Sequence, residues 1–276
     1  MDVIVNRCID EISQNYEGVC DCATPNSSNC FDCFQKQFFD GNEIKYKCDE
    51  KINIYVARYF PVHVKEIFES LKMLPEDFYE SLFNLKDINI MNIGGGPGSD
   101  SFAVKKFLIE KELTGEIQDE KKVYILRIDK ETNWDDMAGF VNERIKSTEH
   151  IEFISKKSSF DVGIEKKWSL SNRKYNIFTI SYLLSEIDNS KISILSKFIN
   201  SYASNVVCGL IINDNNRLKV HQLKQSLFQN ILCKIHNEAE DSTRHHCGFF
   251  YKDEDRDLIN PKLSTNSIRF SKVITL

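Results

Sequence analysis

Three glycines at alternate positions, Gly94, Gly96 and Gly98, come directly after the apolar run Ile90–Ile93. Glycine lets the backbone turn sharply and lets a ligand approach it without an intervening side chain. A helix that begins at such a turn also directs its unpaired N–H groups at the ligand. Because Phe102–Leu113 is amphipathic, the pattern predicts a strand, a tight turn and a helix, which is typical of a site for an adenosyl ligand.

The spacing of the glycines distinguishes between nucleotide-binding turns. A dinucleotide-binding turn has its third glycine three residues after the second, and Ser99 occupies that position here. A P-loop ends in Gly-Lys-Ser or Gly-Lys-Thr, and no such triplet follows. The turn instead resembles motif I of the class I S-adenosylmethionine-dependent methyltransferases, which implies S-adenosylmethionine as cofactor against Gly94, Gly96 and Gly98. A dinucleotide-binding turn and a turn without a ligand remain as alternatives.

The resemblance implies further cofactor contacts at the ends of the next two strands. Val123–Asp129 is apolar enough for a buried parallel strand and ends in an acid. In this family such a carboxylate accepts hydrogen bonds from both ribose hydroxyls, so Asp129 is the expected ligand, although a turn or helix-start acid is the alternative. After the short strand Ile151–Ser155, the resemblance places Asp161 on the adenine amine and Val162 against the adenine ring.

The segment Asn176–Ile187 is similar to the fourth strand and its exit, where substrates of this family meet the methyl group. It lacks the Pro-Pro motif of adenine- or glutamine-directed enzymes and the Pro-Cys nucleophile used on pyrimidine carbons. Its Ser-Tyr-Leu-Leu-Ser-Glu-Ile resembles a short motif of the mitochondrial small-subunit-ribosome methyltransferase-like family. The resemblance implies Ser181 as a cofactor contact and Tyr182 and Glu186 as catalytic candidates; a helix-start acid is the alternative for Glu186.

A second group of possible ligands lies in the first 48 residues, which contain six of the nine cysteines. The middle of this stretch is turn-forming and too poor in aliphatic residues to bury a core of its own. A Cys-x-Cys and a Cys-x-x-Cys pair can deliver thiolates to a tetrahedral zinc ion, which would supply folding energy. The predicted metal ligands are Cys20, Cys22, Cys30 and Cys33. Cys8 or Cys48 could replace one of them, and an iron–sulfur cluster or redox-active cysteines remain as alternatives.

The composition is that of a globular protein: 41% of the 276 residues are hydrophobic and 28% are charged. This length suits one α/β domain with a small appendage. A net charge of -5 disfavours a broad nucleic-acid surface, which needs clustered lysine and arginine. There is no apolar run of membrane-spanning length and no signal-peptide pattern at the N-terminus, so a cytoplasmic protein without a membrane contact is expected.

Alternating strands and helices must position these residues. An amphipathic helix that begins at Pro61 is expected before the first strand. The last two strands, Cys247–Tyr251 and Ile268–Thr275, are expected to pair as a hairpin. The fold class is therefore α/β: a seven-stranded, mostly parallel Rossmann-like sheet with a C-terminal antiparallel hairpin, preceded by a small Cys-rich N-terminal module and a helix.

This organisation predicts three segments in the chain. Residues 1–50 would form the Cys-rich metal-binding module, residues 51–85 a helical cap or linker, and residues 86–276 the S-adenosylmethionine-binding domain. In the cap, Tyr55 and His63 could face the ligand or be part of the core.

The sequence thus predicts an enzyme that transfers a methyl group from S-adenosylmethionine to a nitrogen or oxygen nucleophile of a small molecule or an RNA. Such an enzyme must hold donor and acceptor in line and exclude water. A base could be needed as well, for which Glu186, His63, His221 and His245 are candidates. The alternative is a catalytically inactive protein of the same fold that uses its Cys-rich module to contact a partner. Oligomeric state is not predicted.

Overall fold

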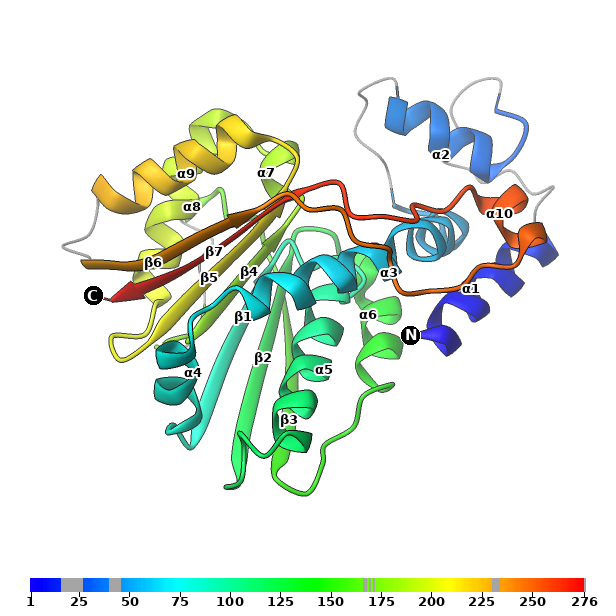
Figure 1. The fold of residues 1–276 in the computed structure, drawn as a ribbon. Helices are drawn as coiled ribbons and strands as arrows, with labels where there is room; N and C mark the ends of the chain where they lie inside the picture. Colours follow the sequence, from blue (N-terminus) through cyan, green and yellow to red (C-terminus); the bar gives the residue numbers. More distant parts are fainter. Residues whose placement is uncertain are drawn as a thin grey trace.

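The computed structural model describes residues 1–15, 27–39, 46–165, 168, 170, 172–229 and 234–275 (Figure 1). Its centre is a seven-stranded sheet in the order β3-β2-β1-β4-β5-β7-β6, in which β7 is antiparallel to both β5 and β6. The strands are β1 (Asp87–Ile93), β2 (Lys121–Asp129), β3 (Ile151–Ser159), β4 (Ile177–Ser181), β5 (Cys208–Asp214), β6 (Lys234–Asp241) and β7 (Ile268–Thr275). The predicted fold class is confirmed.

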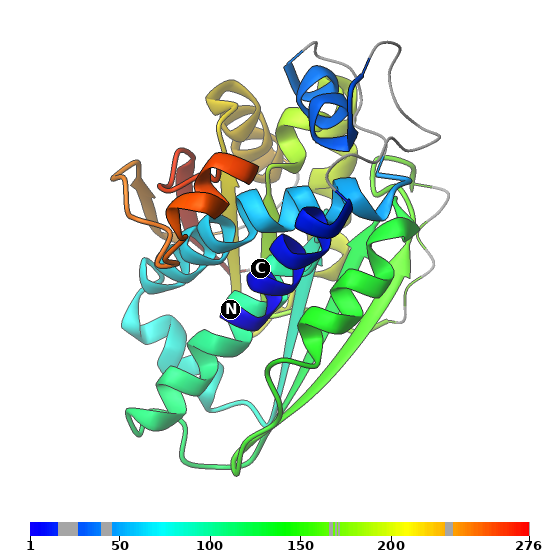
Figure 2. The same cartoon turned by 90° about the vertical axis from the view of Figure 1, so that its right-hand side faces the viewer.

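Helices cover both faces of the sheet, with α3 to α6 on one face and α7 to α9 on the other (Figures 1 and 2). The helices are α1 (Asp2–Asn15), α2 (Cys30–Phe39), α3 (Asp49–Lys72), α4 (Glu76–Phe83), α5 (Ser99–Leu113), α6 (Asp135–Asn142), α7 (Leu183–Glu186), α8 (Asn189–Tyr202), α9 (Arg217–Gln229) and α10 (Asp253–Ile259). In the described ranges, no helix is both long and apolar enough to cross a membrane.

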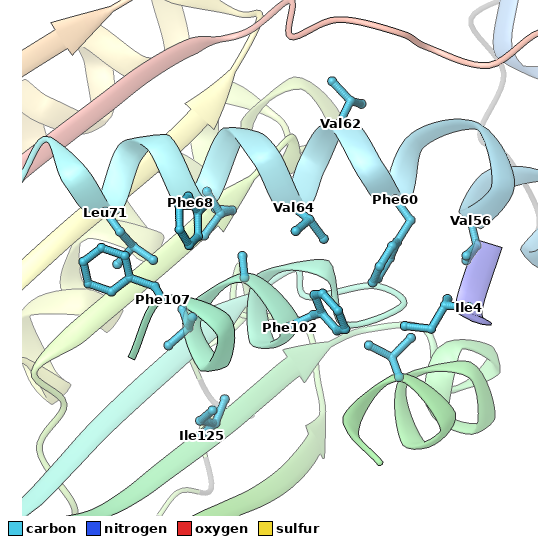
Figure 3. Close-up of a cluster of buried hydrophobic side chains, with 14 of the residues drawn as sticks. Ile4, Val56, Phe60, Val62, Val64, Phe68, Leu71, Phe102, Phe107 and Ile125 are labelled. Carbon is cyan, nitrogen blue, oxygen red and sulfur yellow. The ribbon is translucent and has the colours of Figure 1, made fainter. Parts of the chain in front are cut away.

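The larger hydrophobic core lies between α3, α5 and the sheet (Figure 3). The rings of Phe60 and Phe102 lie 5.5 Å apart, and those of Phe68 and Phe107 lie 5.8 Å apart. Helix α1 adds Ile4 and other apolar residues to the same core, so the start of the chain packs on α3. The division of the chain into three segments stays a prediction.

Pro61 lies inside α3, so the prediction that a helix begins there is wrong. A proline within a helix removes the N–H group that would bond the carbonyl four residues earlier. That carbonyl, of Ala57, instead accepts a hydrogen bond from the Tyr251 hydroxyl at 2.7 Å. The next carbonyl, of Arg58, accepts from the Lys262 N–H at 3.0 Å. The carbonyl that Pro61 leaves without a helical partner is therefore satisfied by Tyr251, a residue distant in sequence.

The antiparallel end of the sheet is confirmed, but one of its two strands was assigned wrongly. The partner of β7 is β6, whereas Cys247–Tyr251 forms no strand. The sequence of β6, Lys-Ile-His-Asn-Glu-Ala-Glu-Asp, is highly polar and lacks a run of apolar residues, because an edge strand needs few. Phe249 and Tyr251, which suggested a strand, are instead buried in the core beside α3.

Candidate functional site

The glycine turn joins the C-terminal end of β1 to the first turn of α5. Gly94, Gly96 and Gly98 have φ values of +67°, +43° and +92°, in the left-handed region that favours glycine. The N–H groups of Gly94 and Gly95 donate to the carbonyl of Ile128 on the neighbouring strand β2, at 2.8 and 3.1 Å. A Cβ atom built on Gly96 would meet nothing within 4 Å. The backbone of this turn is therefore open to a ligand.

Asp129 ends β2, and its carboxylate lies directly beside the glycine turn. Its Oδ2 accepts from the Gly96 N–H at 2.8 Å, and its Oδ1 accepts from the Glu131 N–H at 2.9 Å. Burial raises the pKa of Asp129, against these two hydrogen bonds. The structure thus brings together the two features that the sequence analysis assigned to the cofactor, while the contact with ribose stays a prediction.

Asp161 and Val162 follow β3, which is longer than predicted. The strand runs from Ile151 to Ser159 instead of ending at Ser155, because its polar second half pairs with β2 as far as Asp129. Asp161 therefore follows the strand end closely, at the same edge of the sheet as Asp129. Its carboxylate pairs with the Lys191 ammonium at 2.9 Å, and Val162 is buried. The contacts of both residues with adenine stay predictions.

Ser181 and Tyr182 lie at the end of β4, on the other side of β1. The Ser181 hydroxyl donates to Oδ2 of Asp100 in the first turn of α5, at 3.1 Å. Tyr182 has a φ of +59°, which is uncommon for a residue with a side chain. Its N–H group donates to the Asn213 carbonyl on β5 at 2.8 Å. This conformation turns the chain away from the sheet and directs the Tyr182 ring toward α3.

The Tyr182 hydroxyl is held by Glu66, a fully buried carboxylate on α3. Both carboxylate oxygens lie 3.0 Å from this hydroxyl, and Oε1 also accepts from the Ser267 hydroxyl at 2.8 Å. The Lys262 ammonium donates to the same tyrosine oxygen at 3.2 Å. The imidazole of His63 stacks on the Tyr182 ring, with 4.5 Å between the ring centroids. The ring is therefore fixed from two sides.

A chain of touching rings extends from the end of β4 to the residues that follow β2. The rings belong to Tyr46, Tyr55, Tyr59, His63, Trp134 and Tyr182. At one end, Tyr46 and Trp134 have centroids 4.4 Å apart. Burial raises the pKa of Tyr46, and the charges of Glu186 and Asp129 add to this effect, so both carboxylates lie near this end. The rings thus connect the two strand ends that flank the glycine turn.

The sheet and the glycine turn together decide the fold. The turn follows β1, an acid ends the neighbouring β2, and one antiparallel strand lies between β5 and β6. The turn after the first strand, the acid at the end of the second and an antiparallel end of the sheet were predicted, and the strand order is added by the structure. The chain has the class I S-adenosylmethionine-dependent methyltransferase fold.

No protein-family model and no curated protein matches the sequence. Among solved structures, the chain is similar to the N-methyltransferase NodS from Bradyrhizobium japonicum, at 10% identity and a TM-score of 0.44 over 76% of this chain and 85% of that one. A putative RNA methyltransferase from Pyrococcus horikoshii shares 10% identity at a TM-score of 0.43, over 75% and 81% of the two chains.

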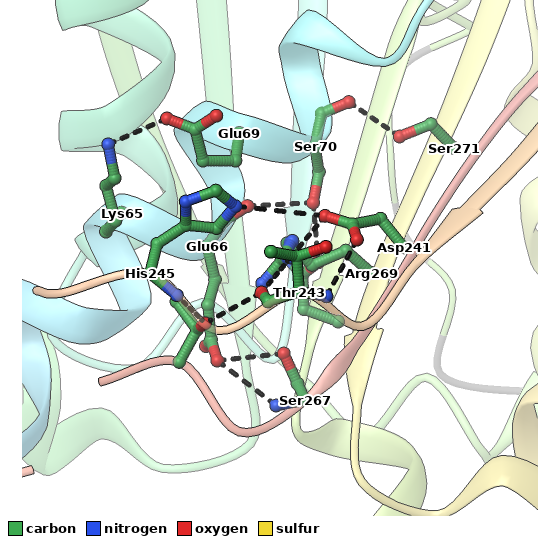
Figure 4. A network of polar contacts seen from close by, with 12 residues as sticks. Lys65, Glu66, Glu69, Ser70, Asp241, Thr243, His245, Ser267, Arg269 and Ser271 are labelled. Carbon is green, nitrogen blue, oxygen red and sulfur yellow. Dashed lines mark hydrogen bonds and ion pairs between the residues drawn. The ribbon is translucent and has the colours of Figure 1, made fainter.

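The histidines named as possible bases lie in different surroundings. Burial lowers the pKa of His63 to about 3, so its imidazole is neutral at physiological pH. His221 is exposed on α9. His245 lies beside Asp241, with 3.9 Å between Nε2 and Oδ2, in a polar network that joins α3 to β6 and β7 (Figure 4). Glu186 is exposed at the end of α7, and its charge contributes to the raised pKa of Tyr46 at one end of the aromatic rings.

Only two of the four predicted metal ligands lie among the described residues. Cys30 and Cys33 lie one turn apart at the start of α2 and are buried. The Sγ atoms of Cys30 and Cys48 are 3.8 Å apart. Cys20 and Cys22 lie outside the described residues. Among the residues that are described, no group of three or more His, Cys, Asp or Glu side chains is arranged to hold a metal ion, so zinc is not supported there.

Sequence reasoning missed two buried carboxylates of this site. Asp100 is 1% exposed and adjoins the glycine turn, so an acid directly after the turn was an available signal. Glu66 is 0% exposed, but in the sequence it resembles any charged residue on an amphipathic helix. Its partner Tyr182 is 116 positions away, and no local pattern reports such a contact.

Proposed function

We propose that the protein is an S-adenosylmethionine-dependent methyltransferase that acts on a nitrogen or oxygen nucleophile of a small molecule or an RNA. The observation that carries this proposal is the open backbone at Gly96 beside the carboxylate of Asp129, 2.8 Å from N to Oδ2. A carboxylate held at this place can accept the two ribose hydroxyls of an adenosyl ligand. Asp161 and Val162, at the next strand end, would then receive the adenine.

The residues at the end of β4 would position the reacting groups. Bound S-adenosylmethionine supplies an electrophilic methyl group on a sulfonium, so the protein must align the acceptor and exclude water. The Tyr182 ring, fixed by Glu66 and His63, would form one wall of the acceptor site. Burial raises the pKa of Tyr182 far above its usual value, so its hydroxyl keeps its proton. Glu186, exposed beside the rings, would accept a proton from the nucleophile.

Gly96→Ala tests the cofactor site with one methyl group. The added Cβ would occupy the open space at the turn, and φ there is unfavourable for a side chain. We expect S-adenosylhomocysteine to bind the wild type and to bind the variant at least roughly tenfold more weakly in calorimetry. Gly139→Ala is the matched control, because its Cβ also meets nothing within 4 Å but lies in α6 with an ordinary φ. The absence of binding heat with the wild type would refute the proposal.

The alternative function is a catalytically inactive binding protein with the same fold. Transfer of a labelled methyl group from S-adenosylmethionine to total RNA, protein or metabolite extracts separates the two functions. We expect label in one fraction, which would also assign the acceptor to a small molecule or to RNA. Binding of the cofactor without labelling of any extract would favour the inactive protein.

We also propose a structural zinc ion that Cys30 and Cys48 would share with the predicted ligands Cys20 and Cys22, which lie outside the described residues. The support is the 3.8 Å separation of the Cys30 and Cys48 Sγ atoms. Tetrahedral zinc with Zn–S bonds of about 2.3 Å places two thiolates about 3.8 Å apart. Metal analysis of the purified protein should find about one equivalent of zinc, which Cys30→Ser should reduce. Less than about half an equivalent in the wild type would refute the site, and iron in place of zinc would indicate a cluster.

A further inference from the structure

Asp100, the second residue of α5, is a buried carboxylate whose hydrogen-bond partners in the described ranges are the uncharged hydroxyls of serine and threonine residues. The Ser181 hydroxyl lies 3.1 Å from its Oδ2, and the Ser99 hydroxyl lies 3.5 Å from its Oδ1. No basic side chain of the described ranges forms an ion pair with it. Burial raises the pKa of Asp100 to about 6, against the hydroxyls of Thr179 and Ser181. A buried carboxylate in such surroundings lacks a counter-charge.

A second observation indicates that a hydrogen-bond donor is missing at the same place. The Oδ1 atom of Asn92 is buried without a hydrogen-bond partner. Asn92 is the second residue before Gly94, and it pairs in register with Thr179 on β4, whose hydroxyl faces Asp100. Because buried polar atoms are almost always hydrogen-bonded, this amide oxygen and the carboxylate of Asp100 together call for a ligand with several N–H donors.

The strand order identifies which part of the cofactor reaches this place. Strand β1 lies between β2, which carries Asp129, and β4, which ends at Ser181. A ligand with its ribose at Asp129 and its chain across the glycine turn must place its other end on the β4 side. That end of S-adenosylmethionine carries a carboxylate and an ammonium group. The N–H groups at the start of α5 suit the carboxylate, and the ammonium needs an acid.

We propose that the Asp100 carboxylate binds the α-ammonium group of S-adenosylmethionine, assisted by the amide oxygen of Asn92. This inference rests on the proposed function. An ammonium donates three hydrogen bonds and carries the charge that Asp100 lacks. The hydroxyl of Ser181 orients the carboxylate and thereby acts as a positioning residue.

Calorimetry with two ligands tests this contact separately from the rest of the cofactor site. S-adenosylhomocysteine has the amino-acid end, whereas 5′-methylthioadenosine has the adenosine and the thioether but no amino acid. Asp100→Asn should weaken the binding of S-adenosylhomocysteine roughly tenfold to hundredfold. The same variant should change the affinity for 5′-methylthioadenosine by less than about twofold. Asp129→Asn is the control, and it should weaken the binding of both ligands by similar factors. Equal weakening of both ligands by Asp100→Asn, or no effect on either, would overturn the inference.

A measurement on the unchanged protein avoids any dependence on the folding of the variant. An analogue of S-adenosylhomocysteine that lacks only the α-amino group should bind the wild type at least roughly tenfold more weakly than S-adenosylhomocysteine. Equal binding of the two by the wild type would overturn the contact while leaving the proposed function intact. If the wild type binds neither S-adenosylhomocysteine nor 5′-methylthioadenosine, the proposed function itself fails.

Discussion

Glu66 and Asp100 are both buried carboxylates near the end of β4, but their surroundings differ. Glu66 accepts hydrogen bonds from the Ser267 hydroxyl and from backbone N–H groups (Figure 4). It also accepts from the Tyr182 hydroxyl, whose oxygen in turn accepts from the Lys262 ammonium. Among the described residues, the hydrogen-bond partners of Asp100 are all hydroxyl groups. A fully satisfied buried charge fixes the elements around it, whereas an unsatisfied one is destabilising unless a ligand completes it.

This difference separates a structural role from a binding role. Glu66 joins α3 to the end of β4 and to the segment before β7, so it fixes the Tyr182 ring against α3. Asp100 joins little more than α5 to the end of β4. Strain and uncompensated charge tend to collect at functional sites, where the ligand supplies the missing interaction. The comparison therefore predicts opposite effects on stability when each charge is removed.

The largest effect is expected for Glu66→Ala. Loss of this carboxylate leaves the buried donors of Tyr182 and Ser267 without an acceptor, which should lower the free energy of unfolding by about 3–5 kcal/mol. Urea denaturation measures the change. The matched control is Glu69→Ala, because Glu69 is partly exposed on the same helix and forms a surface ion pair with Lys65. If the two variants lose equally little stability, the network around Glu66 is not structural.

Asp100→Asn is expected to change stability in the opposite direction, and only above acidic pH. The pKa of Asp100 is about 6 in the folded protein, above its ordinary value of 3.8. Between these values the folded state holds the proton more tightly, so the free energy of unfolding falls as the pH rises from about 4 to 6. At pH 7.5, ionised Asp100 lowers the free energy of unfolding of the wild type by up to about 3 kcal/mol. The asparagine variant does not have this loss.

Urea denaturation of the wild type and Asp100→Asn at pH 4, 5, 6 and 7.5 checks this expectation. The variant should be the more stable protein at pH 7.5, and the two should converge near pH 4. The negative charge of Glu66 also raises the pKa of Asp100, in the same direction as burial. A variant that is less stable than the wild type at pH 7.5 would show that Asp100 is satisfied without a ligand.

Tyr182→Phe is expected to have an intermediate effect. It keeps the ring that stacks on His63 but removes the hydroxyl that donates to Glu66, at a cost of about 1–2 kcal/mol. Combined with Glu66→Ala, it should add little, because the two residues share one interaction. Full additivity in a double-mutant cycle would mean that the Tyr182 hydroxyl and Glu66 act independently.

The smallest effect is expected for Lys191→Ala. This lysine pairs with Asp161 at 2.9 Å, and both side chains are partly exposed. A pair of this kind contributes less than about 1 kcal/mol and weakens further with salt. Denaturation at low and high salt measures it. A larger loss of stability would show that Asp161 has a structural role, as Glu66 does, and is not simply an accessible acid near the end of β3.

Features that depend on neighbouring residues were predictable from the sequence. The glycine turn, the acid that ends β2 and the alternation of strands and helices each occupy a short stretch, so local pattern and spacing report them. The same reasoning explains two errors. β6 is polar because it is an edge strand. Pro61 lies inside a helix because Tyr251 satisfies the Ala57 carbonyl that the proline leaves without an N–H partner.

The sequence by itself determined the fold class and the edge of the sheet at which a cofactor would bind, because glycine conformation and strand burial are local properties. Only the tertiary structure decided which charges are satisfied. Glu66 meets Tyr182 across 116 positions, and Asp100 meets Ser181 across 81. Whether a buried carboxylate finds a counter-charge depends on every element that packs against it, and no sequence spacing contains that information.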